Sequence, residues 1–273
     1  MLRLRKLFGQ TKCSVIGMIH VGALPGTPGY AGSVQSLVER ACQDAEIYKD
    51  SNIDAVLLEN MHDVPYVQPR DMGPEITAVM ARICTQVREM LPSHVKCGVQ
   101  VLAGGNKQAL AIALAADLQF IRAEGFVFSH MADEGFTDAC AGPLLRYRTN
   151  IRADNILVFT DIKKKHSAHA ITADISLQET AKAAEFFLSD GVIVTGVATG
   201  DPVDEHHFQE VQQCTQLPVL IGSGVTTGNV DRYMDADAVI VGTHFKDNQR
   251  WQNSVNHSQV LRFMDKIHKL RNS

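Results

Sequence analysis

The sequence lacks the features that would place it in a disulfide-rich, zinc-binding or membrane class of protein. Its six cysteines form no CxxC pair, and the chain contains neither an HxH nor an HExxH element. Widely spaced thiols without such motifs favour a reducing compartment, and they argue against a zinc site with a local signature. No apolar run approaches the ~20 residues that a membrane helix requires. We therefore expect a soluble, cytoplasmic protein without a membrane partner.

An excess of positive charge is also missing. The chain has 26 Lys and Arg residues against 30 Asp and Glu residues, a net charge of −4, so bulk electrostatics do not favour nucleic acid as a partner. The first acidic residue is Glu39, and residues 1–12, MLRLRKLFGQTK, are basic. We interpret residues 1–12 as a basic N-terminal arm. A short mitochondrial presequence is the alternative, which would make the location mitochondrial.

Eight short apolar runs are present along the chain, and each is bounded by glycine, proline or polar residues. Their nearly continuous apolar character is typical of strands that are covered on both faces, as in a parallel sheet. The runs span residues 14–20, 55–60, 96–102, 120–125, 156–162, 191–196, 218–225 and 238–245.

Helical patterns separate most of these runs. Ser33 stands where an N-cap is expected before a helix over 33–48, and Pro74 occupies a favoured first helical position for 74–91. Further helices are predicted at 106–116, 177–188, 204–214 and 257–270, with a short one near 229–234. Strands that alternate with helices predict a single (β/α)8 TIM barrel over residues 13–273. A doubly wound open sheet, which usually has fewer strands, is the alternative.

Polar residues stand at the ends of the expected strands, where a barrel places its active site. Alternation puts Arg122 and Glu124 on one face of their strand, and burial against outer helices would be costly, so we expect both to face the barrel mouth. The same reasoning selects one residue on each of five other strands: His20, Glu59, Gln100, Asp161 and Thr195. So many polar groups at one rim indicate a ligand site, in which His20, Glu59, Arg122, Glu124 and Asp161 are catalytic candidates.

The last two apolar runs end in glycine-rich turns, IGSGVTTGN (221–229) and VGTHF (241–245). Barrels frequently bind phosphate after strands 7 and 8, with backbone N–H groups of such turns as donors. The glycines let the backbone approach an anion closely, and nearby hydroxyls can add further donors. We predict a phosphate site built from Gly222, Ser223, Gly224, Gly242 and Thr243, with Thr226 beside it.

Two further loops are too polar to be simple connectors. Residues 125–142 are long for a strand-to-helix loop, and residues 161–170, DIKKKHSAHA, contain three lysines and two histidines. We predict that the second loop folds over the phosphate site and brings Lys165 and His166 to the ligand. A loosely held divalent cation on Glu59, Asp161 or Glu124 is the cofactor that this set of carboxylates could bind.

Beside this interpretation of the residues, several motifs resemble those of the BtpA family, which is named for a cyanobacterial protein required for photosystem I accumulation. The motifs, in this order, are VIGMIHVGALPGTPGY (15–30), DAVLLENMHDVPY (54–66), FIRAEGF (120–126), DEGFTDACAGPLLRYR (133–148), DIKKKHSAH (161–169), IGSGVTTGN (221–229) and DAVIVGTHFK (237–246). The resemblance covers nearly the whole chain and is to an animal-type member. It implies a barrel of the ribulose-phosphate-binding type, but no reaction that can be carried over. AGGN (103–106) departs from the Arg-Asn-Asp element that is typical of bacterial members, so an arginine contact is not expected there.

We therefore expect an enzyme that acts on a small phosphorylated metabolite by lyase, isomerase or aldol-type proton transfer. Glu59 or Asp161 would be the base, and Lys165 with His166 would be the acidic or electrophilic partners. A divalent-ion-dependent hydrolase of nucleotide phosphates is one alternative, and a non-enzymatic assembly or stability factor is another. The expected partner is a phosphorylated small molecule, and a homo-oligomer is considered beside a monomer.

Overall fold

The eight apolar runs form eight parallel strands that close into a barrel in the computed structural model, which describes residues 7–9, 11–196 and 200–272. The strands are β1 (Ser14–His20), β2 (Ala55–Glu59), β3 (Lys96–Gln100), β4 (Phe120–Ala123), β7 (Leu157–Ile162), β9 (Gly191–Val194), β10 (Val219–Ile221) and β11 (Ala238–Val241). They are paired in the order β1-β11-β10-β9-β7-β4-β3-β2, and β1 pairs with β2 to close the circle. The predicted (β/α)8 TIM barrel is confirmed.

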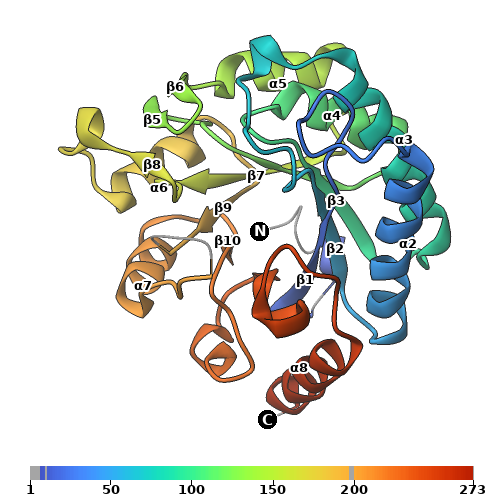
Figure 1. Cartoon of the computed structure of the whole chain (residues 1–273). Helices are drawn as coiled ribbons and strands as arrows, with labels where there is room; N and C mark the ends of the chain where they lie inside the picture. Colours follow the sequence, from blue (N-terminus) through green and yellow to red (C-terminus); the bar gives the residue numbers. More distant parts are fainter. Residues whose placement is uncertain (1–6, 10, 197–199, 273) are drawn as a thin grey trace.

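Helices surround this barrel on its outside (Figure 1). They are α2 (Val34–Asp50), α3 (Pro74–Met90), α4 (Asn106–Ala115), α5 (Ala141–Asn150), α6 (Leu177–Phe186), α7 (Glu205–Cys214) and α8 (His257–Arg271), and the 3-10 helix η3 (Val230–Tyr233) takes the place of a helix after β10. Ser33 caps α2, because its side chain accepts a hydrogen bond from the N–H of Ser36. The helix α5 was not predicted; its sequence, AGPLLRYRTN, has no clear apolar stripe.

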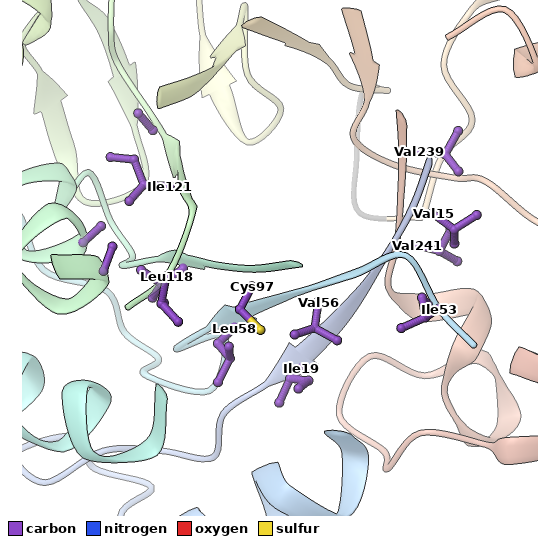
Figure 2. Packing of buried hydrophobic residues seen from close by; sticks show 14 of the residues in the cluster. Val15, Ile19, Ile53, Val56, Leu58, Cys97, Leu118, Ile121, Val239 and Val241 are labelled. Atoms are coloured by element: carbon purple, nitrogen blue, oxygen red, sulfur yellow. The ribbon is translucent and has the colours of Figure 1, made fainter. Parts of the chain in front are cut away.

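Alternate residues of each strand belong to two separate apolar clusters. The side chains that point outward pack against the helices; Figure 2 shows Val15, Ile19, Val56 and Leu58 of this outer cluster. The side chains that point inward fill the barrel and include Ile16, Met18, Leu57, Phe120, Phe159, Ile193, Leu220 and Ile240. The same alternation carries the inward face to the carboxyl end of the barrel, where the polar candidates stand at the last residue of β1, β2 and β3 and at the second-last residue of β4 and β7.

A small antiparallel sheet joins the two long polar loops. It consists of β5 (His130–Ala132), β6 (Gly135–Thr137) and β8 (Ser167–Ala168), with β5 in the centre, and lies to one side of the barrel (Figure 1). The backbone carbonyl of Glu134, in the turn between β5 and β6, accepts a hydrogen bond of 2.8 Å from Gln68 of the loop after β2. The loops that follow β2, β4 and β7 are therefore fastened to one another.

Leu7 and Phe8, near the start of the described residues, lie close to the interior of the barrel. Leu7 and Phe8 are partly buried and pack against the inward-facing cluster. Residues 1–6 and 10 of the predicted arm lie outside the described residues. The barrel itself begins at Ser14, the first residue of β1.

Candidate active site at the carboxyl ends of the strands

A cavity of about 340 Å³ opens at the carboxyl ends of the barrel strands, where active sites of this fold lie. His20, Glu59 and Gln100 are direct partners in the register of β1, β2 and β3, so their side chains stand side by side. All of the predicted candidates line this cavity except Thr195: His20, Glu59, Gln100, Arg122, Glu124, Asp161, Lys165, His166, Gly222, Ser223, Gly224, Thr226, Gly242 and Thr243. The structure thus brings candidates from seven of the eight barrel strands and their loops to one place, and Gly200 of the loop after β9 also lines the cavity.

Arg122 and Asp161 form a buried ion pair inside this cavity. The Nε and Nη2 atoms of Arg122 each donate a hydrogen bond of 2.9 Å to the carboxylate of Asp161, one to each oxygen. Burial disfavours the guanidinium cation, but the carboxylates of Asp161, Glu59 and Glu124 outweigh this effect and raise the pKa of Arg122. A charged fork held in this way is rigid, and its remaining N–H groups can bind an oxygen of a ligand.

Glu124 is a carboxylate held by two donors, one on each oxygen. Its Oε1 accepts a hydrogen bond of 3.1 Å from Lys164, and its Oε2 accepts one of 2.8 Å from the N–H of Gly104. Asn106, at the start of α4, holds the backbone of Glu124 with two further hydrogen bonds. Burial raises the pKa of Glu124, but Lys164, the Gly104 N–H and Arg122 lower it by more. The AGGN segment (103–106) therefore has the role of holding Glu124 in its ionised form.

The pKa of Glu59 is raised, in contrast to the lowered pKa of Glu124. Glu59 is 7% exposed, and this burial raises its pKa to about 7 against the opposing effect of Arg122 and Lys165. Burial and the nearby Lys246 keep the pKa of His20 well below 6.5, so this ring is neutral at pH 7. Nδ1 of His20 donates to the carbonyl of Trp251 at 2.9 Å, which leaves Nε2 as an acceptor 4.0 Å from Glu59. Glu59 can thus hold or release a proton at neutral pH.

The lysine segment after β7 lies between two residues with left-handed backbone. Lys163 has a φ of 45° and His166 a φ of 54°, a conformation that non-glycine residues adopt at some cost. Lys165 lines the cavity, and burial together with Arg122 lowers its pKa to about 8. His166 also lines the cavity, on its exposed side.

This segment reaches the cavity that the glycine-rich turns also line, so Lys165 and His166 lie in one cavity with Gly224, Gly242 and Thr243. The sequence did not predict how the segment is held: Ser167 and Ala168 pair with β5, and Lys164 forms an ion pair with Glu124. This pairing forms because β5 offers free backbone hydrogen-bonding groups next to the segment.

The glycine-rich turns after β10 and β11 are arranged in a way that sequence patterns do not show. The N–H of Gly222 donates to the carbonyl of Val194 at 2.8 Å, so it is not directed at a ligand. The hydroxyl of Ser223 accepts from the N–H of Gly196 and donates to the carbonyl of Asp201. The Gly222 N–H and the Ser223 hydroxyl therefore connect this turn to the end of β9 and the loop that follows it. Because both groups already have protein partners, they are not available as direct donors to a phosphate.

Gly224 has a φ of 67°, and a Cβ atom there would lie 2.2 Å from the carbonyl of Asp201. Only glycine fits this left-handed position against another segment of backbone. Gly242 and Thr243 also line the cavity. A Cβ at Gly242 would make a tight contact of 3.3 Å with the side chain of Met18, so the backbone there lies close to β1.

Several cavity residues were missed by the sequence analysis. Lys164, Glu134, Tyr66, His244 and Trp251 all line the cavity, yet none is at the end of a barrel strand. Lys164 could have been selected, because it belongs to the same lysine run as Lys165. Trp251 is the single tryptophan of the chain, and this was the one feature of the sequence that could have marked it as a candidate.

The described part of the chain offers no group of three or more His, Cys, Asp or Glu side chains that could hold a metal ion. Within that same part, no helix combines the length and the apolar character needed to cross a membrane.

A sequence model of the BtpA family matches residues 11–269. The chain belongs to the BtpA family. Among its relatives is an uncharacterized protein of Caenorhabditis elegans, named as mitochondrial, which is 44% identical over 97% of each chain. Another is the photosystem I biogenesis protein BtpA of Synechocystis, which is 28% identical over 94% of this chain and 88% of that protein. An animal relative and a cyanobacterial one thus share the family.

Solved structures similar to this member of the BtpA family share its fold at low identity. Tryptophan synthase subunit alpha from Legionella pneumophila has a TM-score of 0.61 at 14% identity, with 98% of this chain and 97% of that chain covered. Thiamine phosphate pyrophosphorylase from Pyrococcus furiosus has a TM-score of 0.59 at 12% identity, with 99% of each chain covered.

Proposed function

We propose that this protein is an enzyme that acts on a small phosphorylated metabolite by lyase, isomerase or aldol-type proton transfer. The reaction takes place in the cavity at the carboxyl ends of the strands, and the loops after β10 and β11 hold the phosphate. One structural neighbour, thiamine phosphate pyrophosphorylase, is named for a phosphorylated molecule, and it has the same fold. This likeness supports the class of substrate.

The observation that carries the proposal is the pair of Glu59 and Lys165 in one cavity. The pKa of Glu59 is raised to about 7, and that of Lys165 is lowered to about 8. A group whose pKa lies near the working pH can both take and return a proton, which is what proton transfer at carbon requires. Glu59 is the base in this proposal. Lys165, with His166 beside it, protonates the substrate, stabilises an enolate or forms a Schiff base.

In this proposal, Arg122 and Asp161 do not transfer the proton but stabilise charge on the substrate. The two hydrogen bonds to Asp161 fix the guanidinium over the cavity, where it stabilises negative charge that develops on a substrate oxygen. Asp161 is consequently the partner of Arg122, and Glu59 is the better choice as the base. In this proposal, Gly224, Gly242 and Thr243 of the glycine-rich turns, which line the cavity, contact the phosphate.

The two alternatives have less support. A divalent-ion-dependent hydrolase needs carboxylates that are available to a cation, but Asp161 and Glu124 are paired with Arg122 and Lys164. An assembly or stability factor on a barrel scaffold has no use for a buried carboxyl and a buried lysine of perturbed pKa in one cavity.

The test uses exchange of carbon-bound hydrogen, since this does not require the full reaction to be known. The purified protein is incubated in D2O with a set of phosphorylated metabolites, and deuterium incorporation is followed by NMR and mass spectrometry. We expect incorporation into one compound with the wild-type protein and none with Glu59→Gln. Release of inorganic phosphate without exchange, or equal exchange in Glu59→Gln, would contradict the proposal.

Of the two locations expected from the sequence, we propose the mitochondrial one as the better supported. The relative from Caenorhabditis elegans is named as a mitochondrial protein, and residues 1–12 are basic. Fluorescence of a fusion to the intact chain in animal cells tests this directly, and a diffuse cytoplasmic signal would contradict it.

A further inference from the structure

One side of the cavity is apolar, and the chemistry proposed above does not use it. Met61 and Tyr66 from the loop after β2, Leu102 from the loop after β3 and Trp251 from the segment after β11 line this side, which we call the apolar wall. A phosphate group is bound by hydrogen-bond donors and positive charges, and proton transfer at a neighbouring carbon atom requires acids and bases. Neither requires an apolar surface of this kind. Apolar surface that faces a cavity is a common mark of a ligand-binding site.

The ring of Trp251 is held in a defined orientation. The imidazole of His62 lies 5.0 Å from it at an interplanar angle of 56°, and that of His20 lies 6.3 Å away at 72°. The backbone carbonyl of Trp251 is fixed by the hydrogen bond from His20 Nδ1. Two aromatic contacts and one backbone contact thus position an indole that lines the cavity, and ring–ring contacts of this kind depend on orientation.

Met61 and Tyr66 are fastened to each other on the same wall. The hydroxyl of Tyr66 donates to the carbonyl of Met61 at 2.8 Å and lies 3.7 Å from the Met61 sulfur. The polar end of the tyrosine is therefore satisfied within the loop, and its ring and the thioether are left as apolar surface. Thioether sulfur packs favourably against aromatic rings.

The strand order places Trp251 across the barrel from Arg122, because β11 and β4 stand on opposite sides of the circle of eight strands. The strands that precede the wall residues, β11, β2 and β3, lie with β1 on one continuous part of this circle, and Glu59 stands at the end of β2. The glycine-rich turns after β10 and β11 are next to the segment that carries Trp251. A ligand whose phosphate lies at these turns can reach Glu59 with one part and the apolar wall with another, and a cavity of about 340 Å³ has space for both.

We infer that the substrate carries a planar ring in addition to its phosphate, and that this ring packs against the apolar wall with Trp251 as its main contact. The inference rests on the proposed function, because it takes the phosphate from there and adds the second chemical feature of the same ligand. Trp251 is in this role a specificity-determining residue.

The experiment compares three probes that differ only in what is attached to the phosphate: inorganic phosphate, glycerol 3-phosphate and phenyl phosphate. Their dissociation constants are measured by calorimetry for the wild-type protein, for Trp251→Ala and for Phe186→Ala. Phe186 is an exposed aromatic residue on α6 outside this cavity, so its replacement is the matched control. Trp251 is the single tryptophan, so its fluorescence gives a second reading in the unaltered protein.

We expect the wild type and Phe186→Ala to bind phenyl phosphate about three- to tenfold more tightly than glycerol 3-phosphate, as ring packing contributes. Trp251→Ala should lose this preference and keep its affinity for inorganic phosphate. Phenyl phosphate, but not glycerol 3-phosphate, should change the tryptophan fluorescence of the wild type.

Equal affinity of the wild type for the two esters, with no change in fluorescence, would overturn this inference and leave the proposed function standing. A preference that persists in Trp251→Ala would also overturn it, since the ring would then bind elsewhere. Failure of all three phosphates to bind would contradict the proposed function itself.

Discussion

Arg122 and Asp161 meet through two parallel hydrogen bonds of 2.9 Å, and both side chains are buried at the end of the barrel. Each of the two buried charges compensates the other, so removal of either one alone leaves an uncompensated buried charge. The pair is therefore a fixed part of the cavity. Because both carboxylate oxygens of Asp161 accept hydrogen bonds from Arg122, Asp161 is not the base in the proposed reaction.

Replacing one member of this pair should be strongly destabilising. We expect Arg122→Met to lower the free energy of unfolding by about 3–5 kcal/mol, because it leaves the Asp161 carboxylate buried and unpaired. Urea denaturation measures the effect. The control is Lys266→Met, which breaks an exposed ion pair with Asp231 and should cost less than about 1 kcal/mol. Similar small losses in both variants would mean that the Arg122 pair contributes little to the fold.

Glu59→Gln should stabilise the protein, and the gain should depend on pH. The folded state raises the pKa of Glu59 from 4.5 to about 7, so between these values the folded protein binds one proton more than the unfolded chain. Stability of the wild type therefore falls as pH rises through this window, whereas the neutral amide has no such dependence. The advantage of Glu59→Gln should grow by roughly 2–3 kcal/mol between pH 5 and pH 8, at 1.36 kcal/mol per pKa unit. Denaturation curves at the two pH values give this difference, and a constant advantage would contradict the raised pKa.

Lys165→Arg and His166→Ala should reduce turnover far more than ligand binding. Burial lowers the pKa of Lys165 to about 8, whereas arginine stays protonated and cannot form a Schiff base. Loss of a proton-transfer group typically costs about 10²- to 10⁴-fold in kcat. Lys163→Arg is the matched control, since Lys163 donates to the carbonyl of Thr172 and does not line the main cavity. Equal and modest losses in turnover and binding would leave Glu59 as the group that carries the chemistry.

The pH dependence of turnover should show which form of Lys165 acts. If neutral Lys165 is the nucleophile, kcat rises as Glu59 ionises near pH 7 and rises again through pH 8. If Lys165 acts as a protonated acid, kcat falls above pH 8 and the profile is bell-shaped. A profile that is flat from pH 6 to pH 9 would exclude both roles.

A charge at Thr243 should test the phosphate site without damage to the fold. Thr243 lines the cavity after β11 and is partly exposed, so Thr243→Glu places a carboxylate where the phosphate is proposed to bind. We expect Thr243→Glu to weaken binding of inorganic phosphate at least tenfold, and Thr243→Gln, of similar size and no charge, to weaken it much less. Equal affinities would place the phosphate elsewhere. Gly224 is unsuitable for this test because any side chain there would meet the backbone of Asp201.

The barrel could be predicted because its signals are local. Each apolar run became a strand, and β1 occupies residues 14–20 as predicted. Alternation within a strand also placed Arg122 and Asp161 correctly at the cavity. The features that were missed depend on distant partners: β5 and β8 have only three and two residues and form by pairing across the sequence. Ser223 was taken for a phosphate donor, yet its hydroxyl is engaged by Gly196 and Asp201, which no local pattern could reveal.

The shared sheet of β5, β6 and β8 has a consequence for how this family can change over evolution. Met131 and Ala132 pair with Ala168 and Ser167 in a fixed register, so an insertion or deletion in one loop would misalign the other. The loops after β4 and β7 should therefore vary in length together among relatives, whereas most loops of a barrel vary independently. New substrate preferences would then arise more readily in the loops after β3 and β11, which take no part in this sheet.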